Sequence, residues 1–148
     1  RTMMGVAPES AYRSQVDYHA PPTAFGANCG AGLANNVAAI VEITAAAAPG
    51  AIIVAKPNCG IPVYKDGRVT YDGTPELMGI YARMVRDAGA RIIGGCCGST
   101  GAHVGAMVEA LDGHVPGAPP SLEQIEAALG PVQRARSPRK GKRKARSG

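Results

Sequence analysis

The pattern that decides the fold lies in residues 88–98, AGARIIGGCCG. Gly89 suits the left-handed position just beyond the end of a helix, and residues 90–94, with Ile92 and Ile93 among them, are predicted to form a short buried strand. The glycines and two adjacent cysteines, Cys96 and Cys97, follow as a loop. This stretch therefore predicts the end of a helix, a strand and a glycine-rich loop in immediate succession.

Helices are predicted on both sides of this strand. Thr74 is a capping residue and Pro75 suits the first helical position, so a helix is expected to begin there. The apolar residues that fall on one face of this helix are Leu77, Ile80, Tyr81, Met84, Val85 and Ala88. A second helix is predicted from about Thr100 to Leu111. The chain thus repeats a strand, a loop and a helix.

The same order is found upstream of residue 74. The other predicted elements are a helix over residues 8–18, a strand over 23–27, a loop over 28–30, a helix over 33–48, a strand over 51–56, a long loop over 57–72, and a short helix that follows the capping box of Ser121 and Gln124. Cys29 lies in the loop that follows the first of these strands. All three predicted strands are therefore followed by a loop and a helix.

Strands that are each followed by a helix imply a parallel sheet, because a parallel pair needs a crossover of this length. Reactive groups in such folds gather at the carboxyl ends of the strands, where Cys29, Cys96 and Cys97 all lie. A complete eight-stranded barrel takes about 250 residues, whereas this chain has 148. We therefore predict an α/β fold that forms half of a (β/α)8 TIM-type barrel. Because the chain starts at Arg1, we expect it to be an internal piece of a longer protein.

The chain has four cysteines, and their spacing limits what they do. Adjacent cysteines rarely bridge each other, and no Cys-x-x-Cys redox motif is present. A zinc ion held by three protein groups keeps one position open, which is typical of catalytic sites. Three thiolates make zinc soft, so an open position of that kind favours a sulfur substrate. Spacing alone leaves zinc ligation and simple burial of small apolar cysteines both open.

The motifs GANC at 26–29 and GGCCG at 94–98 resemble those of the homocysteine S-methyltransferase (homocysteine-binding domain) family. The resemblance extends to about Val132 and makes the chain the C-terminal half of that family's (β/α)8 barrel. It implies that Cys29, Cys96 and Cys97 bind one Zn²⁺, which activates the homocysteine thiol to accept a methyl group and form methionine. Residues 2–6 and the run GTPELM at 73–78 look most like bacterial betaine-homocysteine methyltransferases, so betaine is the implied donor.

The resemblance leaves several roles open. Cys59 falls outside both motifs and is expected to be a packing cysteine, and His103 is expected to be structural rather than a fourth ligand. Asn28 either contacts substrate or forms a turn before Cys29. The family's loop for the homocysteine amino group lies in the N-terminal half, which this chain lacks, so we expect the chain to be inactive alone. Methylfolate and S-methylmethionine remain alternative donors, and Tyr64, Tyr71 and Tyr81 have no role that sequence assigns.

Charge separates the chain into two parts. Eight of the 16 basic residues lie in residues 134–148, which contain no acid, so we predict a barrel domain over residues 1–133 and a disordered basic tail after it. The composition of the tail favours a solubilising role over weak attraction to nucleic acid or an anionic membrane. A structural zinc or thiol module with a nucleic-acid-binding tail is the alternative class. No apolar run approaches the roughly 20 residues of a membrane span, so we expect no membrane partner and a cytoplasmic location.

Overall fold

The computed structural model describes residues 5–133, and the predicted tail lies outside them. The helices and strands in chain order are α1 (Pro8–Val16), β1 (Ala24–Cys29), α2 (Leu33–Ala46), β2 (Ile52–Pro57), β3 (Pro62–Lys65), β4 (Arg68–Tyr71), α3 (Pro75–Asp87), β5 (Ile92–Ile93), α4 (Gly101–Leu111) and α5 (Leu122–Leu129). All the helices and strands predicted from the sequence are present, with ends that differ by a few residues.

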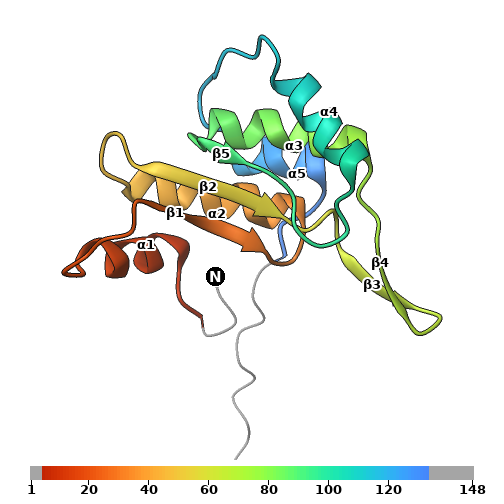
Figure 1. The fold of residues 1–148 in the computed structure, drawn as a ribbon, viewed down its shortest axis with the longest axis horizontal. Coiled ribbons are helices and arrows are strands. Elements are labelled where there is room, and N and C mark those ends of the chain that lie inside the picture. Colours follow the sequence, from red (N-terminus) through yellow and green to blue (C-terminus); the bar gives the residue numbers. More distant parts are fainter. Residues whose placement is uncertain (1–4, 134–148) are drawn as a thin grey trace, which may run out of the picture.

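Strands β1, β2 and β5 form a parallel sheet in the order β1-β2-β5. Helices α2 and α3 pack against one face of this sheet, α5 packs on both of them, and α4 lies on α3 (Figure 1). The prediction of an α/β fold with parallel strands is therefore confirmed. Because three strands do not close on themselves, the described residues show a part of an α/β layer rather than a barrel.

The two faces of the sheet differ in burial. Along β2, Ile53 and Ala55 are 2% and 0% exposed and face the helices, whereas Lys56 is exposed on the other face. Ile92 of β5 pairs with Val54, lies on the face of Lys56 and is 48% exposed. Helices cover one face of the sheet only, and the second face is open within the described residues.

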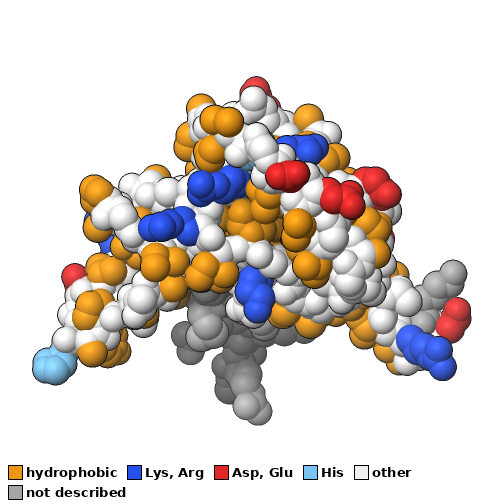
Figure 2. All heavy atoms as spheres, turned by 45° about the horizontal axis from the view of Figure 1, so that its top comes forward, with side chains coloured by type: hydrophobic (Ala, Val, Ile, Leu, Met, Phe, Trp, Pro, Cys, Tyr) orange, Lys and Arg blue, Asp and Glu red, His pale blue; other side chains and the backbone are white. Residues whose placement is uncertain are grey.

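The predicted loop over residues 57–72 is wrong in one respect, because it contains an antiparallel hairpin of β3 and β4. Its turn is formed by Asp66 and Gly67, whose φ angles of 50° and 76° are both positive. A two-residue turn of this kind matches the twist of the paired strands, and Asp-Gly is one of the sequences that favour it. The hairpin projects from the body of the molecule (Figures 1 and 2).

A second difference concerns the end of β1. Asn28 and Cys29 were expected in a loop, but they continue the strand, since they pair in register with Lys56 and Pro57 of β2. Gly26 lies so close to the backbone of Val54 that a Cβ atom there would collide with it. The glycine of the GANC motif thus lets the two strands approach and carries the pairing through to Cys29.

Candidate metal centre

Three cysteine side chains meet at the carboxyl ends of the sheet. Cys29 ends β1, and Cys96 and Cys97 lie in the loop between β5 and α4. The Sγ atom of Cys29 is 3.1 Å from that of Cys96 and 3.8 Å from that of Cys97, and the last two are 3.9 Å apart. Among the described residues, these three sulfurs form a group compact enough to hold one metal ion, with all of them within 4.8 Å of one another.

Cys29 reaches the group through an unusual backbone conformation. Its φ angle is 58°, in the left-handed region that side chains other than glycine rarely adopt. Such strain persists only where the surrounding structure enforces it, and it is concentrated at functional sites. The register of β1 with β2 holds the segment before Cys29, and Asn36 of α2 donates a 3.2 Å hydrogen bond to the carbonyl of Ala27.

The loop of Cys96 and Cys97 is hydrogen-bonded to the end of β2 and to the segment that follows it. The backbone N–H of Cys96 donates to the carbonyl of Pro57 at 2.8 Å, and the N–H of Cys59 donates to the carbonyl of Cys97 at 2.8 Å. Gly98 has a φ of 79°, and a Cβ atom there would meet the ring of Tyr71. Backbone hydrogen bonds and a glycine contact together fix the direction of both cysteines.

Protons are shared unequally among the sulfurs. The hydrogen bond with Cys96 is the main cause that raises the pKa of Cys29 to about 11, with contributions from Cys97 and burial. The same hydrogen bond lowers the pKa of Cys96. Of the two sulfurs, Cys96 is therefore the one that loses its proton more readily. A metal ion replaces such protons as the positive partner of the thiolates.

Tyr71, to which sequence assigned no role, lies beside this group. Burial first, and then a hydrogen bond with Cys97, raise the pKa of Tyr71. Burial and the neighbouring Cys97 thus both favour the protonated form of Tyr71. Tyr81 is instead fully buried in the core, and Tyr64 is 76% exposed on the hairpin. No signal in the sequence separates the three tyrosines, because only the fold of the hairpin brings Tyr71 to the cysteines.

The residues around the sulfurs fit a soft metal ion such as zinc. Three thiol ligands from two separate strand ends leave room for a fourth ligand, as catalytic zinc sites do. The Oδ1 atom of Asn58, a residue of the segment fastened to the cysteine loop, is buried and has no hydrogen-bond partner among the described residues. A buried polar atom without a partner is uncommon, and a bound water or ion is one explanation for it.

The sequence profile of the homocysteine S-methyltransferase family matches residues 1–111. The chain belongs to the homocysteine S-methyltransferase family. The match includes all three clustered cysteines and ends with α4, so α5 lies beyond it. Members of the homocysteine S-methyltransferase family transfer a methyl group to a thiol, a reaction that suits a site built from soft sulfur ligands.

The structure also places the other candidate residues of this homocysteine S-methyltransferase family member, Asn28, Cys59 and His103. Asn28 is exposed at the end of β1, and its side chain contributes a hydrogen bond that lowers the pKa of Cys96. Cys59 is fully buried, and its Sγ faces the carbonyl of Gly73 at 3.2 Å. His103 accepts a 3.1 Å hydrogen bond from the N–H of Thr100 and so caps α4. Neither Cys59 nor His103 belongs to the group of three sulfurs.

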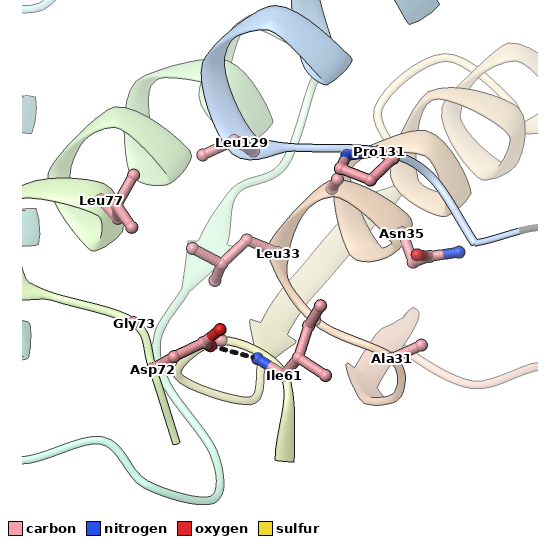
Figure 3. A pocket seen from close by; sticks show the side chains of 12 residues that line it. Ala31, Leu33, Asn35, Ile61, Asp72, Gly73, Leu77, Leu129 and Pro131 are labelled. Atoms are coloured by element: carbon pink, nitrogen blue, oxygen red, sulfur yellow. Dashed lines mark hydrogen bonds between the residues drawn. The ribbon is translucent and has the colours of Figure 1, made fainter. Parts of the chain in front are cut away.

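A small cavity of about 110 Å³ lies between α2, α3 and α5 and the base of the hairpin, and Figure 3 shows the residues that line it. Leu33 of α2, Leu77 of α3 and Leu129 of α5 line it together with Asp72, whose Oδ1 accepts a 2.7 Å hydrogen bond from the N–H of Ile61. No cysteine lines this cavity, and its one carboxylate already holds the base of the hairpin. It is therefore a packing gap between helices rather than part of the metal centre.

None of the helices in residues 5–133 is both long enough and apolar enough to cross a membrane.

Proposed function

We propose that this chain carries the zinc site of an enzyme that methylates homocysteine at sulfur and forms methionine. The observation that supports the proposal is the convergence of Cys29, Cys96 and Cys97 from two strand ends. Cys29 is 67 residues from Cys96 and 68 from Cys97 in the chain. Family membership supports thiol methylation, and the three sulfurs support zinc as the metal.

The chemistry follows from the donor set. When bound, zinc supplies a soft Lewis acid that keeps a substrate thiol in its thiolate form near neutral pH. Cys29, Cys96 and Cys97 would hold the ion and would leave one position for the homocysteine sulfur. The Tyr71 hydroxyl lies beside Cys97 and would withdraw charge from that ligand by donating to it, since a hydrogen bond to a ligating group changes its basicity. A sulfur lone pair then forms the new bond to the methyl carbon while the bond from that carbon to the donor breaks.

We propose betaine as the donor, in which case the bond that breaks is a carbon–nitrogen bond and dimethylglycine leaves as a neutral amine. The support for betaine is the sequence likeness at residues 2–6 and 73–78 alone. In the structure, residues 74–78 begin α3, and the Thr74 hydroxyl accepts the N–H of Leu77 at 3.3 Å. That run therefore has a structural role as well, and methylfolate and S-methylmethionine remain the alternatives that the experiment must separate.

The outer strands of the described sheet have unpaired edges, and these edges support the proposal of a larger barrel. Within the described residues, β1 and β5 each pair with β2 only and carry an unpaired edge on the other side. Exposed edges of this kind are normally covered by further strands. We propose that residues 1–133 are one part of a (β/α)8 barrel and that additional strands complete it and supply the site for the homocysteine amino group.

The function is tested by methionine formation from homocysteine with betaine, methylfolate and S-methylmethionine in turn, using zinc-loaded protein that includes the complete barrel. We expect turnover with betaine and none after Cys97→Ser. Zinc-loaded protein that forms no methionine from any donor would overturn the proposal. Turnover with another donor would retain thiol methylation and replace betaine.

A further inference from the structure

Lys56 has an unusual position for a lysine. It is the exposed residue near the end of β2, between the buried Ala55 and Pro57, and it points away from the helices. Its register partner on β1 is Asn28. On the other side, a Cβ atom at Gly94 would lie 3.7 Å from the Cγ and Cε atoms of Lys56, so the aliphatic stem lies across Gly94.

The ammonium group of Lys56 has no carboxylate partner among the described residues. Within residues 5–133, the basic side chain that contacts a carboxylate is His114, whose Nε2 lies 2.8 Å from the Oδ1 of Asp87, far from Lys56 in the chain. Surface lysines are often unpaired because water solvates them. Lys56 differs from those lysines because its stem crosses the open face of the sheet, the face that the proposed barrel would enclose.

The same strand ends carry Lys56 and the three sulfurs. Asn28, its register partner, immediately precedes Cys29, and the carbonyl of Pro57, the next residue, accepts the hydrogen bond from Cys96. Gly94 lies two residues before Cys96. One cation and one group of thiols thus stand together at the carboxyl ends of β1, β2 and β5, where ligands bind in parallel α/β folds.

We propose that Lys56 binds the carboxylate of a substrate that reacts at the cysteine centre. The inference rests on the proposed thiol methylation, and two substrates offer the carboxylate: homocysteine, whose carboxylate is joined to its sulfur by a short carbon chain, and a donor such as betaine. A hydrogen bond between ammonium and carboxylate is charge-assisted and stronger than a neutral one. Glycine at 94 leaves the space that the lysine stem occupies.

Binding to cobalt-substituted protein that includes the complete barrel tests the inference without turnover, since a thiolate that joins the metal changes the cobalt absorption. The probes are homocysteine and 3-aminopropane-1-thiol, which has the same thiol and amine but no carboxylate. If homocysteine supplies the carboxylate, Lys56→Met raises the Kd for homocysteine at least about tenfold, or about 1.4 kcal/mol, and leaves that for the aminothiol unchanged. If the donor supplies the carboxylate, Lys56→Met leaves the Kd values of both thiols unchanged. It then raises the Kd for betaine by a similar factor, measured by calorimetric titration.

Two matched variants complete the test. Lys56→Arg keeps a cation and should restore most of the affinity, whereas Arg91→Met removes a cation just before β5, at the opposite end of the sheet, and should change nothing. The inference is overturned if Lys56→Met raises the Kd values of both thiols equally. It is also overturned if the variant binds homocysteine and betaine as tightly as the wild type does. Wild-type protein whose metal takes up neither thiol would overturn the proposed function, and the carboxylate site with it.

Discussion

The hydroxyl of Tyr81 donates a 2.8 Å hydrogen bond to the Oδ1 of Asn36, and both side chains are buried. Asn36 in turn donates through its Nδ2 to the carbonyl of Ala27, two residues before Cys29. One chain of hydrogen bonds therefore links α3 to α2 and then to the end of β1. It ties the helical layer to the strand that brings Cys29 to the group of three sulfurs.

Replacing Tyr81 with Phe should lower the free energy of unfolding by about 1–3 kcal/mol, because the Asn36 Oδ1 would remain buried without its donor. Urea denaturation of the two proteins measures the difference. Tyr64→Phe is the matched control, since Tyr64 is 76% exposed and its hydroxyl can bond to water. Equal stability of the Tyr81→Phe and Tyr64→Phe variants would contradict this account of the buried bond.

Cys96→Ser should reduce bound zinc from about one ion per chain to a small fraction, because the loss of one thiolate leaves two protein ligands. Metal analysis after dialysis provides the measurement. Cys59→Ser is the control, because Cys59 is buried outside the group of three sulfurs and should leave the zinc content unchanged. Equal zinc in the wild type and in Cys96→Ser would remove Cys96 from the ligand set.

Zinc should also stabilise the fold, because the ion binds a site that the unfolded chain does not hold together. Free zinc at 100 times its Kd should raise the free energy of unfolding by about 2.7 kcal/mol. Thermal unfolding with and without a chelator shows this as a shift in Tm. The Cys96→Ser variant should show little or no shift. A wild-type Tm that is independent of zinc would indicate that no preformed site binds the ion.

Gly98→Ala should weaken zinc binding, because the residue has a φ of 79° and a Cβ atom would meet the Tyr71 ring at 2.5 Å. Both effects move the loop that presents Cys96 and Cys97. Competition with a chromophoric chelator gives the zinc affinity of the variant. Gly105→Ala, in the middle of α4 with open space around it, should bind zinc as the wild type does. Equal affinities of these two variants would show that the contact with Tyr71 does not position the loop.

Gly67→Ala should loosen the hairpin without affecting the metal. Its φ of 76° is unfavourable for alanine by roughly 1–2 kcal/mol, while no neighbouring atom would clash with the new methyl group. Amide hydrogen exchange in β3 and β4 should accelerate, and zinc affinity should stay constant because Tyr71 lies at the base of the hairpin. Unchanged exchange in both strands would contradict the two-residue turn.

Much of the local structure could be predicted from short patterns. Thr74 and Pro75 indicated the start of α3, and the capping box of Ser121 and Gln124 indicated α5; both features are present. The hairpin was missed although Asp66-Gly67 is a turn signal, because the apolar residues around it, such as Val63 and Val69, remain 46% and 55% exposed and give no strong alternation with a buried face. The position of Tyr71 beside the cysteines could not be predicted, since Tyr71 does not stand in a cysteine motif.

The sequence by itself determined the order of the helices and the three parallel strands, the family and the three cysteines near strand ends, because capping, turn and periodicity rules act over a few residues. Only the tertiary structure decided which groups meet. The register of β1 with β2 brings Cys29 within 3.1 Å of Cys96, which is 67 residues away in the chain, and the fold of the hairpin places Tyr71 beside Cys97. Such contacts depend on strand pairing between distant segments, and no local pattern records the register of that pairing.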